Sequence, residues 1–184
     1  MTERRRHGWK TLGSKIAYKN SWIRVREDRV TYPDGREGIY GVVEKPAGVC
    51  IVPLTARGGV MLLRQYRYTI DRVVWELPAG GISQGETERG AARRELAEEM
   101  SLKASKLSRL GNFYTALGHE STEIIAYRAE GLRPLEIPSQ AQGDESILEI
   151  REFTLPALRR LIASGKLEDG IALASLQLHL NRKA

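Results

Sequence analysis

The chain has 184 residues, the length of one ordinary domain or of one domain with a small appendage. Hydrophobic residues make up 41% and charged residues 28%, which excludes a disordered chain, and the apolar stretches are far too short to span a bilayer. The single cysteine, Cys50, excludes an internal disulfide and favours a reducing compartment. Because no apolar segment follows the basic start of the chain, a secretory signal is not expected, and we predict a cytoplasmic protein.

The net charge of +6 suits an anionic partner such as a phosphate compound, although a merely solvated basic surface remains an alternative. The basic residues are scattered, and aromatic residues make up only 7% of the chain. A nucleic-acid-binding surface is therefore not expected, since it would interleave aromatic and basic side chains.

The first third of the sequence is predicted to be β-structure. Alternating branched residues over 23–32 and 38–44 flank the turn Pro33-Asp34-Gly35, and this pattern predicts a hairpin. Residues 49–54 and 60–66 flank Gly58-Gly59 and predict a second one.

A short strand over 73–77 then leads into Pro78-Ala79-Gly80-Gly81, which we predict to be a loop. Apolar residues at helical spacing predict a helix over 87–100. Further strands are expected over 107–114, 123–129 and 148–153, a surface loop over 131–143, and helices over 155–164 and 171–180. Strands around one central helix, with helices at the end, predict an α/β or α+β sandwich.

Three acidic side chains crowd onto one side of the central helix. Glu95, Glu98 and Glu99 are three and four residues apart, so their like charges repel each other. A divalent cation would resolve this repulsion, and hard oxygen ligands suit Mg²⁺ or Mn²⁺. The alternative is a solvated acidic face that Arg93 and Arg94 neutralise.

The surrounding residues carry a family resemblance. Gly80, Glu86, Arg94-Glu95-Leu96 and Glu98-Glu99 stand at the spacings of the Nudix box, so the segment resembles that of the Nudix hydrolases. The one departure is Ser101, which stands where the box has a glycine. That position follows the helix, where a left-handed residue commonly ends it, so the departure concerns the helix end rather than the chemistry.

The resemblance implies a fold, a reaction and a set of roles. The fold would be the Nudix α/β/α sandwich with a mixed sheet, preceded by a small N-terminal antiparallel β region, and the reaction would be hydrolysis of a nucleoside diphosphate linked to another group. Glu95 and Glu99 would be the main metal ligands, Glu98 would hold a further ion and serve catalysis, and the carbonyl of Ala79 would complete the metal site. Arg94 would orient the glutamates as part of the catalytic set, with Glu86 as an outer carboxylate.

Outside the box, Arg64-Gln65-Tyr66-Arg67 and the segment 75–80 are similar to the ADP-ribose pyrophosphatase group, which also contains GDP-mannose hydrolases. The resemblance implies the following residues on the substrate side: Arg67 for a phosphate, or else for a surface ion pair, Glu76 for the nucleoside side or a partner chain, Tyr66 for a base or else for the core, and Gly118 in a substrate-side loop. It also implies a loop acid, Glu145 or alternatively Asp144, that acts as the general base or as an extra metal ligand.

The expected reaction is cleavage of ADP-ribose to AMP and ribose 5-phosphate. Leu117 stands where relatives that prefer ADP-ribose often have proline, which weakens this assignment. The alternatives are a GDP-mannose or dinucleoside polyphosphate hydrolase, a nucleotide sanitiser, or a non-catalytic nucleotide-binding Nudix regulator. We expect residues 1–45 to form the N-terminal β region and residues 46–184 to form the Nudix domain of a homodimer. The N-terminal region is either exchanged between the subunits, as it often is in relatives, or packed on its own domain.

Overall fold

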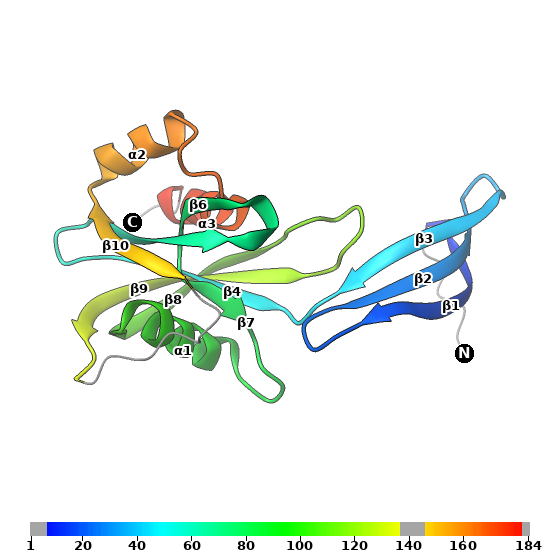
Figure 1. The fold of residues 1–184 in the computed structure, drawn as a ribbon, viewed down its shortest axis with the longest axis horizontal. Coiled ribbons are helices and arrows are strands. Elements are labelled where there is room, and N and C mark those ends of the chain that lie inside the picture. The colour runs from blue at the N-terminus through cyan, green and yellow to red at the C-terminus, as the bar shows by residue number, and fades with distance from the viewer. Residues whose placement is uncertain (1–6, 137–145, 182–184) are drawn as a thin grey trace. The chain divides into compact units, whose positions relative to one another are not determined.

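The computed structural model describes residues 7–136 and 146–181, shown in Figure 1. The chain divides into two compact units. The N-terminal unit contains residues 1–46 and 114–122, and the core unit contains residues 47–113 and 123–184. No described helix is both long enough and apolar enough to cross a membrane.

The N-terminal unit is built on a three-stranded antiparallel sheet. Its strands β1 (Lys10–Lys19), β2 (Arg24–Thr31) and β3 (Glu37–Glu44) are adjacent in chain order, and the hairpin predicted for β2 and β3 is present. We did not predict β1, because nearly all of its residues are exposed and it lacks the alternation that marks a half-buried strand. Trp9 packs edge-on against Tyr32 and Tyr40, with ring centroids 5.0 and 5.7 Å apart.

The core unit contains two sheets and three helices. One sheet has the order β7-β4-β9-β8 and is mixed, because β4 runs antiparallel to β7 and parallel to β9. The other is antiparallel, with the order β10-β5-β6. The strands are β4 (Gly48–Pro53), β5 (Val60–Arg67), β6 (Arg72–Glu76), β7 (Ala79–Gly81), β8 (Leu102–Tyr114), β9 (Glu123–Pro134) and β10 (Ile147–Phe153), and the helices are α1 (Glu88–Met100), α2 (Leu155–Ala163) and α3 (Gly170–Leu180).

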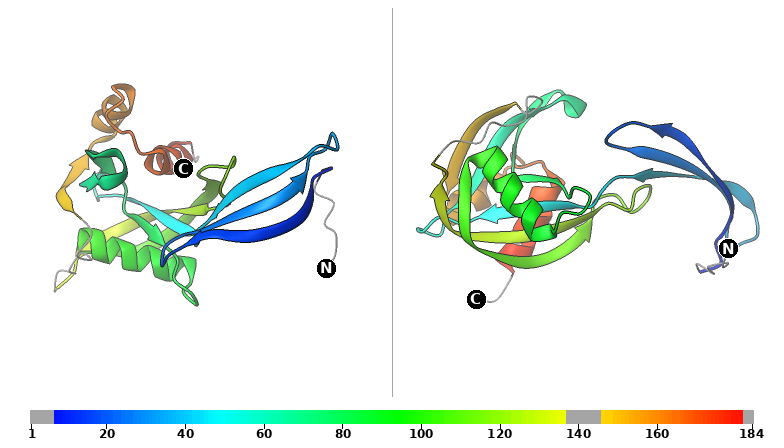
Figure 2. Two further views of the ribbon diagram at one scale, coloured as in Figure 1. Left: turned by 45° about the vertical axis from the view of Figure 1, so that its right-hand side comes forward. Right: turned by 90° about the horizontal axis from the view of Figure 1, so that it is seen from below.

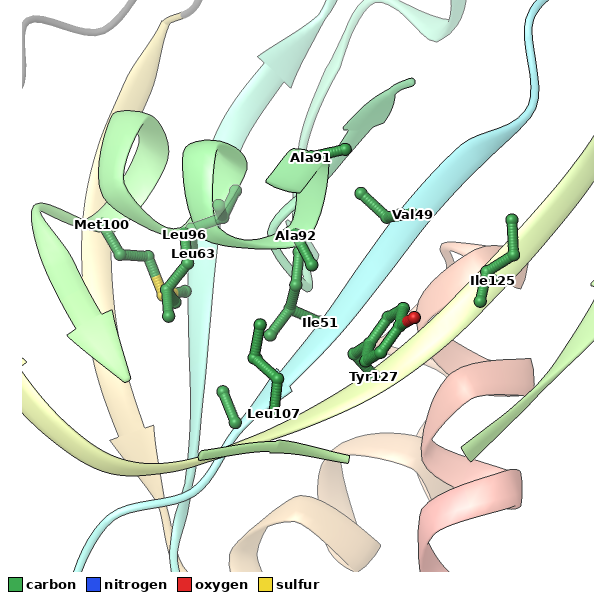
Figure 3. Close-up of a cluster of buried hydrophobic side chains, with 11 residues drawn as sticks. Val49, Ile51, Leu63, Ala91, Ala92, Leu96, Met100, Leu107, Ile125 and Tyr127 are labelled. Carbon is green, nitrogen blue, oxygen red and sulfur yellow. The ribbon is translucent and has the colours of Figure 1, made fainter. Parts of the chain in front are cut away.

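The fully buried strand β4 separates two hydrophobic clusters. Alternate side chains of a strand point to opposite faces, so Val49 and Ile51 pack with α1, whereas Cys50 and Val52 pack with α2 and α3. Figure 2 shows α1 and α3 on opposite sides of the β4–β9 sheet, and Figure 3 shows the α1-side cluster. Helix layers thus cover both faces of a mixed sheet, and the predicted α/β/α sandwich is confirmed.

Two local predictions for the first half of the core unit were wrong. The turn Thr55–Gly59 forms, but β4 and β5 share only the bridge between Leu54 and Val60 and then enter different sheets, so they are not a hairpin. Residues 79–81 are a strand, because their backbone pairs with that of residues 48–50 along the edge of β4.

The strands in the second half are longer than predicted. β8 begins at Leu102, directly after the helix, and β9 continues through Pro134 into the stretch that we expected to be a loop. The two terminal helices agree with the prediction to within one residue at each end, with Thr154 as the N-cap of α2. Residues 137–143 of the predicted loop lie outside the described residues.

Candidate active site

Helix α1 carries the acidic cluster, and the sequence sets both of its ends. The side chain of Thr87 caps the start by accepting a hydrogen bond from the amide of Gly90 at 3.0 Å. At the other end Ser101 adopts the left-handed conformation, with φ 53° and ψ 38°, as its place after the helix predicts. The helix therefore presents Glu95, Glu98 and Glu99 from its last turns.

Arg94 binds three carboxylates at once. Its Nε and Nη2 donate to the two oxygens of Glu86, each at 3.0 Å, and this contact is the main reason why the pKa of Glu86 lies below its usual range. Its Nη1 donates to Glu95 Oε1 at 2.6 Å and to Glu98 Oε2 at 2.9 Å, and Nη2 also donates to the carbonyl of Gly81. Arg94 thus offsets the repulsion between these acids and ties the helix to β7.

Two of the helix carboxylates are buried beside β7. The side chains of Glu95 and Glu99 belong to residues only 5% and 4% exposed. Glu99 Oε2 accepts a hydrogen bond from the amide of Ala79 at 3.0 Å. The carboxylate of Glu95 lies against the α-carbon of Gly80, where a β-carbon would overlap its oxygens. Only glycine at position 80 therefore leaves room for Glu95 in this position.

A second charged group lies on the β5–β6 part of the core unit. Arg67 binds the carboxylate of Glu76 through Nε at 2.8 Å and Nη2 at 2.6 Å, and these hydrogen bonds raise the pKa of Arg67. Glu76 is buried, and it also accepts a hydrogen bond from Gln65 Nε2 at 2.8 Å. The negative charges of Glu99 and Asp169 also favour the charged form of Arg67 and raise its pKa.

The donor chemistry of the α1–β7 region fits a hard divalent cation. The candidate ligands are the carboxylates of Glu95, Glu98 and Glu99 and the carbonyl of Ala79, and the bare α-carbon of Gly80 leaves the space that the Glu95 carboxylate occupies. Within the described ranges, no three acidic, histidine or cysteine side chains converge on one point at metal-binding distance. In this arrangement Arg94 holds Glu95 and Glu98, so an ion would compete with the guanidinium for both.

The other predicted site residues are more scattered. Tyr66 is partly exposed and its hydroxyl donates to Asp71 Oδ1 at 3.0 Å. Gly118 belongs to the N-terminal unit, where its carbonyl accepts a hydrogen bond from the hydroxyl of Tyr40. Glu145, with its alternative Asp144, lies outside the described residues. Trp75 packs edge-on against Phe153 beside the cluster that faces α2 and α3.

Two residues of this region were not singled out from the sequence. Gln65 is the buried donor to Glu76, and its place two residues before Arg67 on a strand was the signal that both side chains share a face. Asp169 caps α3 by accepting from the amides of Ile171 and Ala172, and burial raises its pKa. The Asp-Gly pair before an apolar helical run was the signal for this cap.

Known proteins share both the sequence pattern and the fold. A family model described as nucleoside diphosphate sugar hydrolase N-terminal domain matches residues 9–43, and the NUDIX domain model matches residues 44–174. The chain therefore belongs to the NUDIX family.

Relatives extend over nearly the whole chain. An ADP-ribose pyrophosphatase of Mycobacterium tuberculosis is 32% identical over 92% of this chain and 82% of its own length. An ADP-ribose pyrophosphatase of Bacillus subtilis is 29% identical over 91% of this chain and 90% of its own length. A methanol dehydrogenase activator of Bacillus methanolicus is 28% identical over 92% of this chain and 92% of its own length. The crystal structure of an ADP compounds hydrolase covers 94% of this chain and 92% of its own with a TM-score of 0.82 at 20% identity, which shows a shared fold.

These matches confirm two expectations from the sequence. The N-terminal match, together with the bacterial relatives, bears out the resemblance to the ADP-ribose pyrophosphatase group. The NUDIX match bears out the expected class of enzyme, a pyrophosphohydrolase.

Proposed function

We propose that this protein is a divalent-metal-dependent hydrolase that cleaves ADP-ribose to AMP and ribose 5-phosphate. The observation that carries the proposal is the gathering of Glu95, Glu98 and Glu99 at the end of α1, around Arg94 and beside Ala79. A binding module has no need to bury Glu95 and Glu99 at the cost of desolvation, which favours an enzyme over a nucleotide-binding regulator. The names of two bacterial relatives favour ADP-ribose as the substrate.

In this proposal Ala79, Glu95, Glu98 and Glu99 hold Mg²⁺ or Mn²⁺. A metal held there would neutralise charge on the diphosphate and lower the pKa of a water molecule. Arg94 belongs to the same set, because it orients Glu95 and Glu98 and offsets the repulsion between their like charges. Glu145 is our candidate for the general base that takes a proton from the attacking water.

On the substrate side, Arg67 is proposed to bind a phosphate oxygen. A guanidinium fork suits oxyanions, and this one leads from the end of β5 with its side chain 45% exposed. Glu76 fixes Arg67 and adjoins the nucleoside side, and Tyr66 offers a partly exposed ring for a base. Gly118 is proposed to lie in a loop that contacts the substrate.

We further propose a cytoplasmic homodimer in which the N-terminal β region, residues 1–45, exchanges between subunits. In the N-terminal unit, Leu12, Ile16, Tyr18 and Ile39 are exposed apolar side chains that a second copy of the chain would cover. The thiol of Cys50 is fully buried, and burial raises its pKa, which makes it an unreactive packing residue suited to a reducing compartment.

A substrate screen tests the proposal directly. The full chain, stripped with EDTA, is given Mg²⁺ or Mn²⁺ and a panel of ADP-ribose, GDP-mannose and diadenosine polyphosphates, and released monophosphate is measured. We expect the highest kcat/KM with ADP-ribose and no turnover without metal. Faster cleavage of GDP-mannose or of the diadenosine polyphosphates would overturn the assignment of ADP-ribose as the substrate. Both are tested because Leu117 stands where relatives that prefer ADP-ribose often have proline. Absence of all turnover would overturn the enzyme proposal.

A further inference from the structure

We propose that Gln65 is a positioning residue, which fixes through Glu76 the direction in which Arg67 presents its guanidinium to the diphosphate. This inference rests on the proposed function, in which Arg67 binds a substrate phosphate. Gln65 itself is only 2% exposed, so it acts on the substrate through its neighbours and not by contact.

The sheet fixes the place of Gln65. β5 is the central strand of its sheet, and Gln65 pairs with Ile147 of β10 on one side and with Val74 of β6 on the other. Side chains two residues apart on a strand lie on the same face of the sheet, so Gln65 and Arg67 point the same way. Glu76 lies opposite Leu63, which puts it diagonal to Gln65 on that same face.

Gln65 and Arg67 both donate hydrogen bonds to Glu76, and the two donors have different roles. Arg67 grips both oxygens of Glu76, which fixes the guanidinium relative to the carboxylate. That grip alone leaves both groups able to turn together about the last torsion of Glu76. Gln65 Nε2 donates to Oε2 at 2.8 Å, and this third donor fixes the carboxylate relative to the sheet.

The chemistry of an amide suits this task. Gln65 is neutral, so it orients Glu76 without neutralising it, and the Arg67–Glu76 pair stays intact. Within the described ranges, no residue is hydrogen-bonded to Arg67 Nη1. That edge of the guanidinium is the part left to face an oxyanion, and its direction follows from the Gln65–Glu76 contact.

Gln65→Met removes the donor and keeps the length of the side chain. With ADP-ribose and Mg²⁺ we expect KM to rise about three- to tenfold while kcat and the melting temperature stay close to wild type, because binding and not turnover is affected. Gln177→Met makes the same change at an exposed position of α3 and should alter neither constant. In an Arg67→Ala background, Gln65→Met should raise KM no further, because the two residues act through one group.

A readout that does not depend on turnover completes the test. The Nε–H of Arg67, assigned by its loss in Arg67→Ala, should exchange with water several-fold faster in Gln65→Met than in wild type. Unchanged exchange would overturn the positioning role whatever the substrate is, and so would a KM effect that adds to that of Arg67→Ala. If Arg67→Ala itself leaves KM unchanged, the proposed phosphate contact is wrong, and the exchange rates still decide the role of Gln65.

Discussion

At the scale of single residues, charge balance at the end of α1 depends on Arg94. Its guanidinium donates to Glu86, Glu95 and Glu98, which all carry the same charge and approach each other closely. Glu99 accepts a hydrogen bond from the amide of Ala79. An ion that binds Glu95 and Glu98 would therefore compete with Arg94 for their oxygens.

Glu99→Gln tests the role of one carboxylate. An amide oxygen can still accept the hydrogen bond from Ala79, so the fold should survive, but the lost charge weakens the hold on a dication. We expect kcat to fall by about a hundredfold or more, measured with saturating Mg²⁺. Glu88→Gln, at the first residue of the same helix, is the matched control and should keep wild-type turnover. Wild-type activity in Glu99→Gln would refute the ligand role.

Gly80→Ala tests the space beside Glu95. The new β-carbon would overlap the Glu95 carboxylate, which can swing aside because it ends a flexible side chain. We therefore expect a modest loss of melting temperature but at least a tenfold loss of kcat, since Glu95 leaves its position. Gly81→Ala places a β-carbon in open space and should retain activity, so equal activities in the two variants would contradict this account.

At the scale of elements, the end of α1 departs from the family pattern at Ser101. A left-handed conformation brings the β-carbon of any residue except glycine close to its own backbone. Ser101 accepts this strain, and its amide donates to the carbonyl of Ala97 at 2.9 Å as a normal cap. The helix is thus closed at the expected residue, at a cost in stability.

Ser101→Gly should relieve that cost. We expect the free energy of unfolding to rise by about 1 kcal/mol, with unchanged kcat, because the left-handed penalty is removed. Ser164→Gly is the matched control, since Ser164 ends α2 at φ −83° and gains nothing from glycine. Urea titrations of both variants measure the difference. Equal or opposite shifts would show that Ser101 is not strained.

Prediction from the sequence succeeded where a local signal decides the structure. The apolar spacing predicts α1, and the alternating residues predict β2 and β3. Prediction failed where strand pairing between distant segments of the chain decides the structure. β7 is a strand because its backbone pairs with the edge of β4. The sequence of the turn between β4 and β5 does not reveal that these two strands enter different sheets.

The residues of the candidate site also fall into those that the sequence could predict and those that it could not. Glu95, Glu98 and Glu99 could be grouped from their spacing on one helix, and the family resemblance added Arg94 and Ala79. The buried pair of Gln65 and Glu76 could not be derived, because it depends on the register between β5 and β6. A shift of that register by one residue would point Glu76 to the other face.

At the scale of the whole molecule, the chain separates a core unit from an N-terminal unit with little core of its own. The core unit buries β4 between two helix layers. The three strands of the N-terminal unit bury only Val30 among their apolar residues and leave several large ones exposed. Exposed apolar area of this kind is typical of a surface that a partner covers.

Removal of residues 1–45 should therefore change the oligomeric state. We expect the full chain to sediment as a dimer at micromolar concentration and the truncated chain as a monomer, since the proposed exchanged strands are gone. Ile39→Lys, which keeps every strand but replaces one exposed apolar side chain with a charge, should weaken the dimer in the same assay, whereas Glu37→Lys, also exposed on β3, should not. Identical sedimentation of all these forms would contradict the proposed exchange of the N-terminal strands between subunits.

The hydrogen bond from the Ala79 amide to Glu99 has a practical consequence. Because this amide donates to a side chain instead of to a neighbouring strand, its nuclear magnetic resonance frequency reports where one carboxylate lies. Titration of an ion that draws Glu99 away would shift this single signal in a protein that is not turning over. Ala79 thus serves as an intrinsic probe of site occupancy, independent of any assay of catalysis.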